Sequence, residues 1–164
     1  MKKIILSCFL LVFASMCISL AEAGESINNC PVPDNLKIIE PDGNVVPPKL
    51  ALLSGIWEGV WTMSAVFIVE KIKGNEAVVV HAWSGSSSTG RSSAAASTAP
   101  GFVRQTCPIE KGEDGNYQII FTLKSGTNKL IQTNDPRQIR VVREGFGTMA
   151  SENRDSIFRK KEMK

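Results

Sequence analysis

The chain has 164 residues, 43% of them hydrophobic, and a formal net charge of +3. A charge this close to neutral gives no reason to expect nucleic-acid binding, which normally needs a concentrated basic surface. The length suits one domain with a proper core. The single histidine leaves few ligands for a metal site, so we expect neither a metal nor a cofactor.

Residues 1–23 have the organisation of a secretory signal peptide. Lys2 and Lys3 precede an apolar stretch over 4–20, and an A-x-A cleavage sequence follows at 21–23. The stretch is long enough to span a bilayer, but the cleavage sequence and the lack of a charged stop-transfer cluster favour removal. We therefore expect an exported protein, periplasmic or extracellular, without a transmembrane segment after signal removal.

Two of the four cysteines, Cys30 and Cys107, lie outside this signal. Cysteines of exported proteins usually pair. A redox or metal site is the alternative, and a metal would need further ligands. We predict a structural Cys30–Cys107 disulfide that joins an N-terminal arm to a strand in the middle of the chain.

The arm covers 24–54, where repeated Pro, Asn and Asp favour extended chain, with one short helical turn near 49–53. From residue 55 onward, segments rich in Val, Ile, Phe, Trp and Thr alternate with turn residues. The glycines of 73–75 and 114–116 suit tight hairpins. We predict strands near 56–62, 65–72, 76–83, 102–110, 116–123, 128–133, 137–143 and 155–161, with a weaker one near 146–151.

About eight short strands joined by hairpins predict an all-β fold. A single antiparallel up-and-down barrel over 55–164 is favoured because closing the sheet removes its exposed edges. The Ser/Ala-rich segment 84–100 has almost nothing to bury, so we expect a flexible loop there. The loop is either a tolerated insertion or a flap over the barrel mouth.

Successive side chains of a strand point to opposite faces, so aromatic residues two apart share a face. Trp57 and Trp61 share one with Gly59, whose lack of a side chain leaves room for a crossing residue. Val79, His81 and Trp83 share another face, as do the odd-numbered residues of 117–123. The candidates for the lining of an internal pocket are Trp61, His81, Trp83 and Tyr117, although each also suits a packed core.

The segment Gly55-Ile56-Trp57 resembles the Gly-x-Trp that opens the first strand of lipocalin-like and avidin-like barrels, the calycin group. In that group the Trp closes the barrel base, which implies a structural role for Trp57. An Arg near the end of the barrel stacks on the Trp, and Arg159 stands where such a partner is expected. The two-Trp segment 53–61 is also similar to the opening of a little-characterised bacterial exported barrel domain.

Three kinds of function fit these features. We favour a non-catalytic barrel that binds a small apolar or amphipathic molecule. A barrel filled by its own side chains would instead be an interaction or accessory module, with the arm or the basic tail 159–164 meeting an unknown protein partner or an anionic surface. A hydrolase-type enzyme would use His81 as a base, a Ser of 84–88 as nucleophile and Glu58 as a further acid or base.

Overall fold

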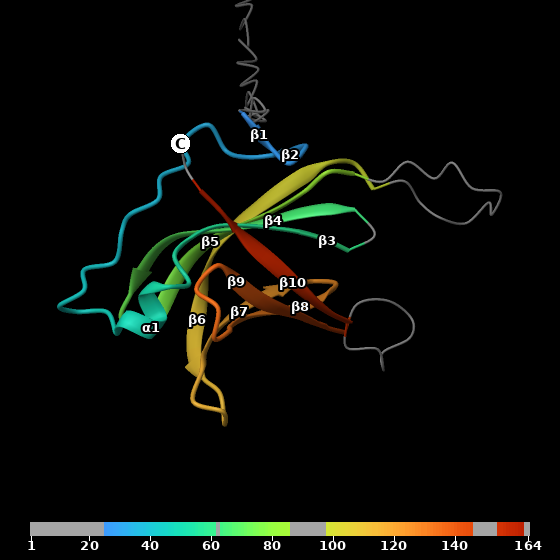
Figure 1. Ribbon diagram of the computed structural model, residues 1–164. Helices are drawn as coiled ribbons and strands as arrows, with labels where there is room; N and C mark the ends of the chain where they lie inside the picture. The colour runs from blue at the N-terminus through green and yellow to red at the C-terminus, as the bar shows by residue number, and fades with distance from the viewer. Residues whose placement is uncertain (1–24, 62, 86–97, 146–153, 163–164) are drawn as a thin grey trace, which may run out of the picture.

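The computed structural model describes residues 25–61, 63–85, 98–145 and 154–162 (Figure 1). Within these residues, eight strands form a closed antiparallel barrel in which neighbours in sequence pair and the last strand pairs with the first. The predicted up-and-down barrel is therefore confirmed. Its strands are β3 (Gly55–Val60), β4 (Ser64–Lys73), β5 (Glu76–Trp83), β6 (Gly101–Lys111), β7 (Tyr117–Leu123), β8 (Gly126–Gln132), β9 (Gln138–Glu144) and β10 (Arg154–Lys161).

The observed strands match the eight main predicted ones to within a few residues at each end. The turns also agree, because Gly74 and Gly115 adopt positive φ angles of 61° and 77° between paired strands. The predicted signal at 1–23, the weaker strand near 146–151 and most of the predicted loop at 84–100 lie outside the described residues.

The barrel interior is filled in its middle by three phenylalanines, Phe67, Phe121 and Phe158, all fully buried. The Phe67 ring lies 6.0 Å from that of Phe121 and 5.4 Å from that of Phe158, both edge to face. Gly59 faces the same layer, since a Cβ built on it would lie 2.6 Å from the Phe158 ring. The expectation that Gly59 makes room for a crossing side chain is confirmed.

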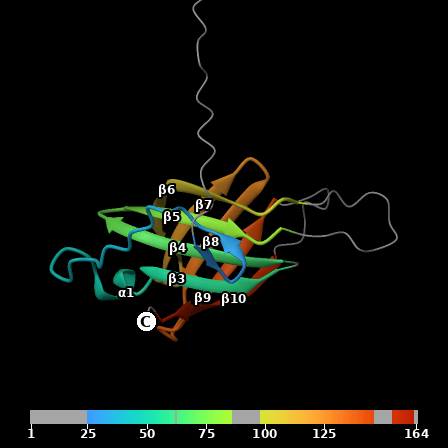
Figure 2. The same ribbon diagram turned by 90° about the horizontal axis from the view of Figure 1, so that it is seen from above.

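Outside the barrel, residues 25–54 form an N-terminal arm that lies over β4 and β5 (Figures 1 and 2). The arm contains the hairpin of β1 (Ser26–Ile27) and β2 (Cys30–Pro31) and a short helix, α1 (Pro48–Ala51), where the helical turn was predicted. Apolar arm residues cover the outward side chains of the sheet, so β4 is buried on both faces. The contacting residues are Ile27, Cys30, Val32, Leu36 and Ile38 against Ile56, Val66, Ile68, Val80 and Ala82.

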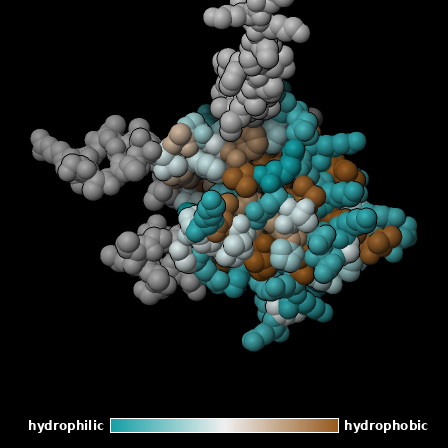
Figure 3. All heavy atoms as spheres, turned by 180° about the vertical axis from the view of Figure 1, so that it is seen from behind, coloured by the Kyte–Doolittle hydropathy of each residue, from teal (hydrophilic) through white to brown (hydrophobic). Residues whose placement is uncertain are grey.

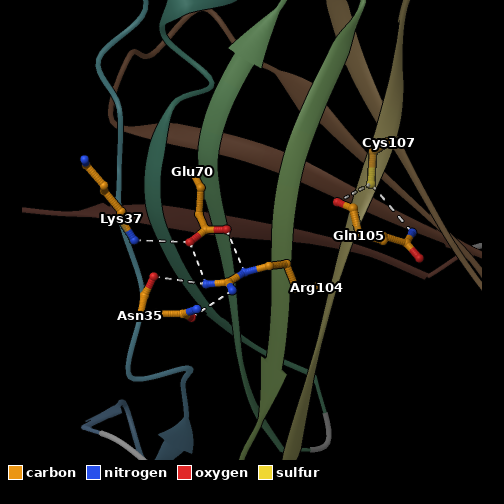
Figure 4. A network of polar contacts seen from close by, with 6 residues as sticks. All are labelled: Asn35, Lys37, Glu70, Arg104, Gln105 and Cys107. Carbon is orange, nitrogen blue, oxygen red and sulfur yellow. Dashed lines mark hydrogen bonds and ion pairs between the residues drawn. The ribbon is translucent and has the colours of Figure 1, made fainter.

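A β-bulge holds the arm in place. The β4–β5 register shifts between Val69 and Lys71, which leaves Glu70 out of the ladder. The Glu70 carbonyl accepts a hydrogen bond of 2.7 Å from the Ile39 N–H. Its carboxylate pairs with Arg104 of β6 at 2.9 Å and accepts from the Lys37 N–H at 3.2 Å (Figure 4). At the bulge, the buried Glu70 therefore binds the arm through both its carbonyl and its carboxylate.

The predicted Cys30–Cys107 disulfide is wrong, because both cysteines are free and buried. Cys30 packs between the arm and the outer face of the sheet, whereas Cys107 points into the barrel beside Ala77. The barrel wall separates the two sulfurs, and no change of rotamer could join them. Burial raises the pKa of each thiol to about 11, so both are unreactive at neutral pH.

One end of the barrel is closed by α1. Leu50 and Leu53, at α1 and just after it, are buried against Trp57 and the inward residues of the adjacent strand ends. The Trp57 Nε1–H donates to the Leu53 carbonyl at 2.8 Å. This arrangement supports the structural role expected for Trp57.

The cation over Trp57 is Lys160, whose Nζ lies 5.1 Å from the ring centroid. The expectation for Arg159 is wrong. In the β3–β10 register Lys160 pairs with Trp57 and Arg159 with Glu58, so Arg159 points outward and is exposed. A shift of one residue in a strand exchanges the two faces, and the sequence alone did not set this register.

No helix in the described part of the chain is both long and apolar enough to cross a membrane. The surface seen from behind shows apolar side chains between hydrophilic ones (Figure 3). Among the described residues, the large apolar side chains that are exposed include Val60 and Ile157, which lie on the neighbouring strands β3 and β10.

Candidate ligand-binding site

A cavity of about 730 Å³ opens at the end of the barrel opposite α1. Here β3, β5 and β7 end and β4, β6 and β8 begin, whereas α1 lies against the start of β3. Inward side chains from six strands or the residues next to them form its walls, and residues of the adjoining turns form its rim. The aromatic and charged wall residues are Trp61, His81, Trp83 and Arg143.

Aromatic rings form the inner part of the cavity. His81 stacks on Phe67 with 4.4 Å between the ring centroids and only 10° between their planes. Its ring also lies edge to face with Phe121, at 5.6 Å, and 5.5 Å from Trp83. The Phe67–Phe121–Phe158 layer therefore ends at His81, and the cavity begins above it. The barrel interior is therefore packed toward α1 and open at the opposite end.

Trp83 is held at the mouth of the cavity. Its Nε1–H donates to the Ala99 carbonyl at 2.8 Å, which ties the end of β5 to the chain just before β6. Gly101 allows this approach, since a Cβ there would lie 2.9 Å from the Trp83 ring. This hydrogen bond fixes the position of the Trp83 indole, which lines the cavity.

Trp61 and Arg143 form the other wall. The guanidinium carbon of Arg143 lies 4.9 Å from the Trp61 ring, a cation–π contact between the end of β3 and β9. The Trp61 ring also lies 5.8 Å from that of Phe158. Its Nε1 is buried and has no hydrogen-bond partner among the described residues. The wall thus combines a flat ring, a donor and a positive charge.

His81 is neutral in this site. Burial, and secondarily the charge of Arg143, lower the pKa of the imidazole from 6.5 to about 4. Its Nδ1 is buried without a hydrogen-bond partner among the described residues. A neutral imidazole can donate from one nitrogen and accept at the other. Near pH 7 His81 therefore offers a ring face and hydrogen-bonding capacity, but no charge.

The structure brings together three of the four predicted lining residues: Trp61, His81 and Trp83. Tyr117 is the exception. It pairs with Lys111 at the opposite end of β7 and packs on the core there, so it does not line the cavity. The prediction placed Tyr117 on the correct inward face, but alternation along a strand does not say at which end of a barrel a residue lies.

Sequence reasoning missed several wall residues, chiefly Arg143, Val103 and Leu123. A signal for Arg143 was present, because Ile139 and Val141 alternate with it on one face of β9. An inward Arg after two inward apolar residues is typical of a functional position, since a charge is costly to bury without use. The rim residues Lys124 and Ser125 lie in the β7–β8 turn and gave no such signal.

Of the residues named for the enzyme alternative, Glu58 and His81 do not meet at the cavity. Glu58 points outward and pairs with Lys161 at 2.8 Å, so it is remote from His81. The serines of 86–88 lie outside the described residues. Within the described part of the chain, no group of three or more His, Cys, Asp or Glu side chains is arranged to hold a metal ion.

Comparisons of the chain with protein-family models, with curated proteins and with solved structures found no significant match. The geometry therefore defines the class of protein. It is a closed eight-stranded antiparallel barrel, plugged at one end by α1 and hollow at the other.

Proposed function

We propose that this protein is an exported, non-catalytic barrel that binds one small apolar or amphipathic molecule. The observation that carries the proposal is the cavity at the open end. Its volume of about 730 Å³ falls within the roughly 300–1,000 Å³ typical of small-molecule sites. Barrels with this number of strands are wide enough to hold one small ligand.

We propose a non-catalytic role because of the surroundings of His81. The imidazole is stacked on Phe67, and its pKa of about 4 makes it a poor base at neutral pH. Export rests on the signal-like segment at 1–23. The Gly-x-Trp resemblance to calycin barrels adds to the binding hypothesis, and membership of that group is part of the proposal.

The test uses the fluorescent neutral probe N-phenyl-1-naphthylamine. We expect its emission to rise on binding and the emission of the cavity tryptophans to change with it. The substitution Val103→Trp fills part of the cavity and should weaken binding at least about tenfold. Thr106→Trp, on the exposed face of the same strand, is the matched control and should bind like the wild type. No binding by the wild type, or equal binding by V103W, would refute the proposal.

A protein-interaction or accessory module is the second candidate function. It is favoured by the exposure of Val60 and Ile157, which are 60% and 48% accessible on neighbouring strands. If this candidate is correct, size-exclusion chromatography of a periplasmic extract should show the protein in a stoichiometric complex that Val60→Ser disrupts. Probe binding would then be absent from the purified barrel.

A further inference from the structure

Three aromatic side chains line the cavity. Trp61, His81 and Trp83 each line it with an aromatic ring, Trp61 from just after β3 and the other two from β5. His81 is backed by the stacked Phe67 ring, and Trp83 is fixed by its hydrogen bond to Ala99. Immobile rings favour a ligand that is itself flat, because stacking needs little further ordering of the site.

The charge on the walls has one sign. Of the side chains that line the cavity among the described residues, the formally charged ones are Arg143 and Lys124, and none is acidic. The carboxylate next along β9, Glu144, pairs with Lys129 of β8 at 2.7 Å. Cationic side chains in the lining favour an anionic group on the ligand.

Arg143 and Trp61 are placed to receive that group together. The guanidinium stacks on the indole at 4.9 Å, and the Trp61 Nε1–H lacks an acceptor among the described residues. Arg143 has further interactions within the protein. A guanidinium has five N–H donors, however, so these interactions and a ligand oxygen can be accommodated together. Carboxylates match such donors better than alcohols do.

We infer that the ligand is a flat aromatic molecule with one anionic group, of the class of aromatic carboxylates. Its rings lie against Trp83 and His81, and its acid group lies at the Trp61–Arg143 pair. The inference rests on the proposed function, because it names the ligand class of the same cavity. An aliphatic acid would pair with the cationic side chains but could not stack on the aromatic ones. A neutral aromatic molecule would stack on the rings but could not form the ion pair.

Isothermal titration calorimetry of the full chain with three probes tests both halves of the inference. We expect naphthalene-2-carboxylate to bind at least about tenfold more tightly than naphthalene-2-methanol, which lacks the charge, and than decanoate, which lacks the rings. If the alcohol binds as tightly as the acid, the ligand does not need an anionic group. If decanoate binds as tightly, the ligand does not need aromatic rings. In either case the proposed function stands, whereas failure of all three probes and of N-phenyl-1-naphthylamine would refute that function too.

A pair of variants on β9 tests whether Arg143 binds the anionic group of the ligand. Arg143→Gln should weaken naphthalene-2-carboxylate about tenfold and leave the neutral alcohol unchanged. Arg140→Gln is the matched control, because Arg140 is exposed on the outer face and pairs with Asp155 at 3.5 Å. An unchanged affinity for the acid in R143Q would refute the assignment of Arg143. If R143Q does not fold, the comparison of acid and alcohol in the wild type still decides the anionic half.

Discussion

Trp57 in the first barrel strand and Trp61 just after it point to the same face, but their surroundings differ. Trp57 is 1% exposed, and its Nε1–H is bonded to the Leu53 carbonyl. Trp61 is only partly buried, and its Nε1 has no partner among the described residues. A cation covers each ring, Lys160 at 5.1 Å and Arg143 at 4.9 Å.

The difference comes from what lies beyond each ring. Beyond Trp57, Leu50 of α1 and Leu53 just after it fill the barrel, and the Leu53 carbonyl accepts a hydrogen bond from the Trp57 Nε1–H. Beyond Trp61, the structure has a cavity in place of a plug. The same alternation of residues therefore produces a core at one end of the barrel and the wall of a cavity at the other. Pairs of substitutions at the two ends can separate these roles.

The largest expected effect is that of Trp57→Ala. Removing a fully buried Trp should lower the free energy of unfolding by about 3–5 kcal/mol. Trp61→Ala should lower it by only about 1–2 kcal/mol, since the ring is partly exposed and borders an existing cavity. Urea denaturation measures both, and probe binding should be lost in W61A. Equal losses of stability would contradict the distinction between the two ends.

Acid should destabilise the open end through His81. The folded protein has a pKa of about 4 at this group, against roughly 6.5 in the unfolded chain. Between these values the unfolded chain binds more protons, so stability falls as the pH falls from 6.5 to 4, by about 3 kcal/mol at pH 4.

His81→Phe should remove this contribution, because Phe can stack on Phe67 without titrating. Urea denaturation at pH 7 and pH 4 measures the difference for both proteins, and the carboxylates common to both cancel in the comparison. A wild type and H81F that lose the same stability on acidification would show that His81 is not buried in the neutral form.

A smaller effect than that of Trp57→Ala is expected for Gly59→Ala, at the boundary between the two ends. The new methyl group would lie 2.6 Å from the Phe158 ring, which must therefore move. We expect a loss of about 1–3 kcal/mol in the free energy of unfolding, with weaker probe binding. Gly43→Ala is the control, because a Cβ there meets nothing within 4 Å. Equal stability of the two variants would show that Phe158 repacks without strain.

Much of the candidate site was predictable, because an inward face depends only on local alternation. His81 and Trp83 were placed together correctly on that basis, and Trp61 on the same face as Trp57. Tyr117 was misplaced because position along the barrel axis depends on how eight strands stagger. Arg143 was missed because a charged residue was not counted in the inward series of Ile139 and Val141.

The sequence by itself determined the eight strands, their turns and which side chains of a strand share a face. These follow from a period of two, β-branched and aromatic residues, and glycines at tight turns, all of which act over a few residues. The tertiary structure alone decided which distant residues meet. The wall between Cys30 and Cys107, the Lys160–Trp57 register and the Glu70 bulge all depend on how remote strands align. A one-residue shift in that alignment exchanges inside and outside, and no local pattern encodes it.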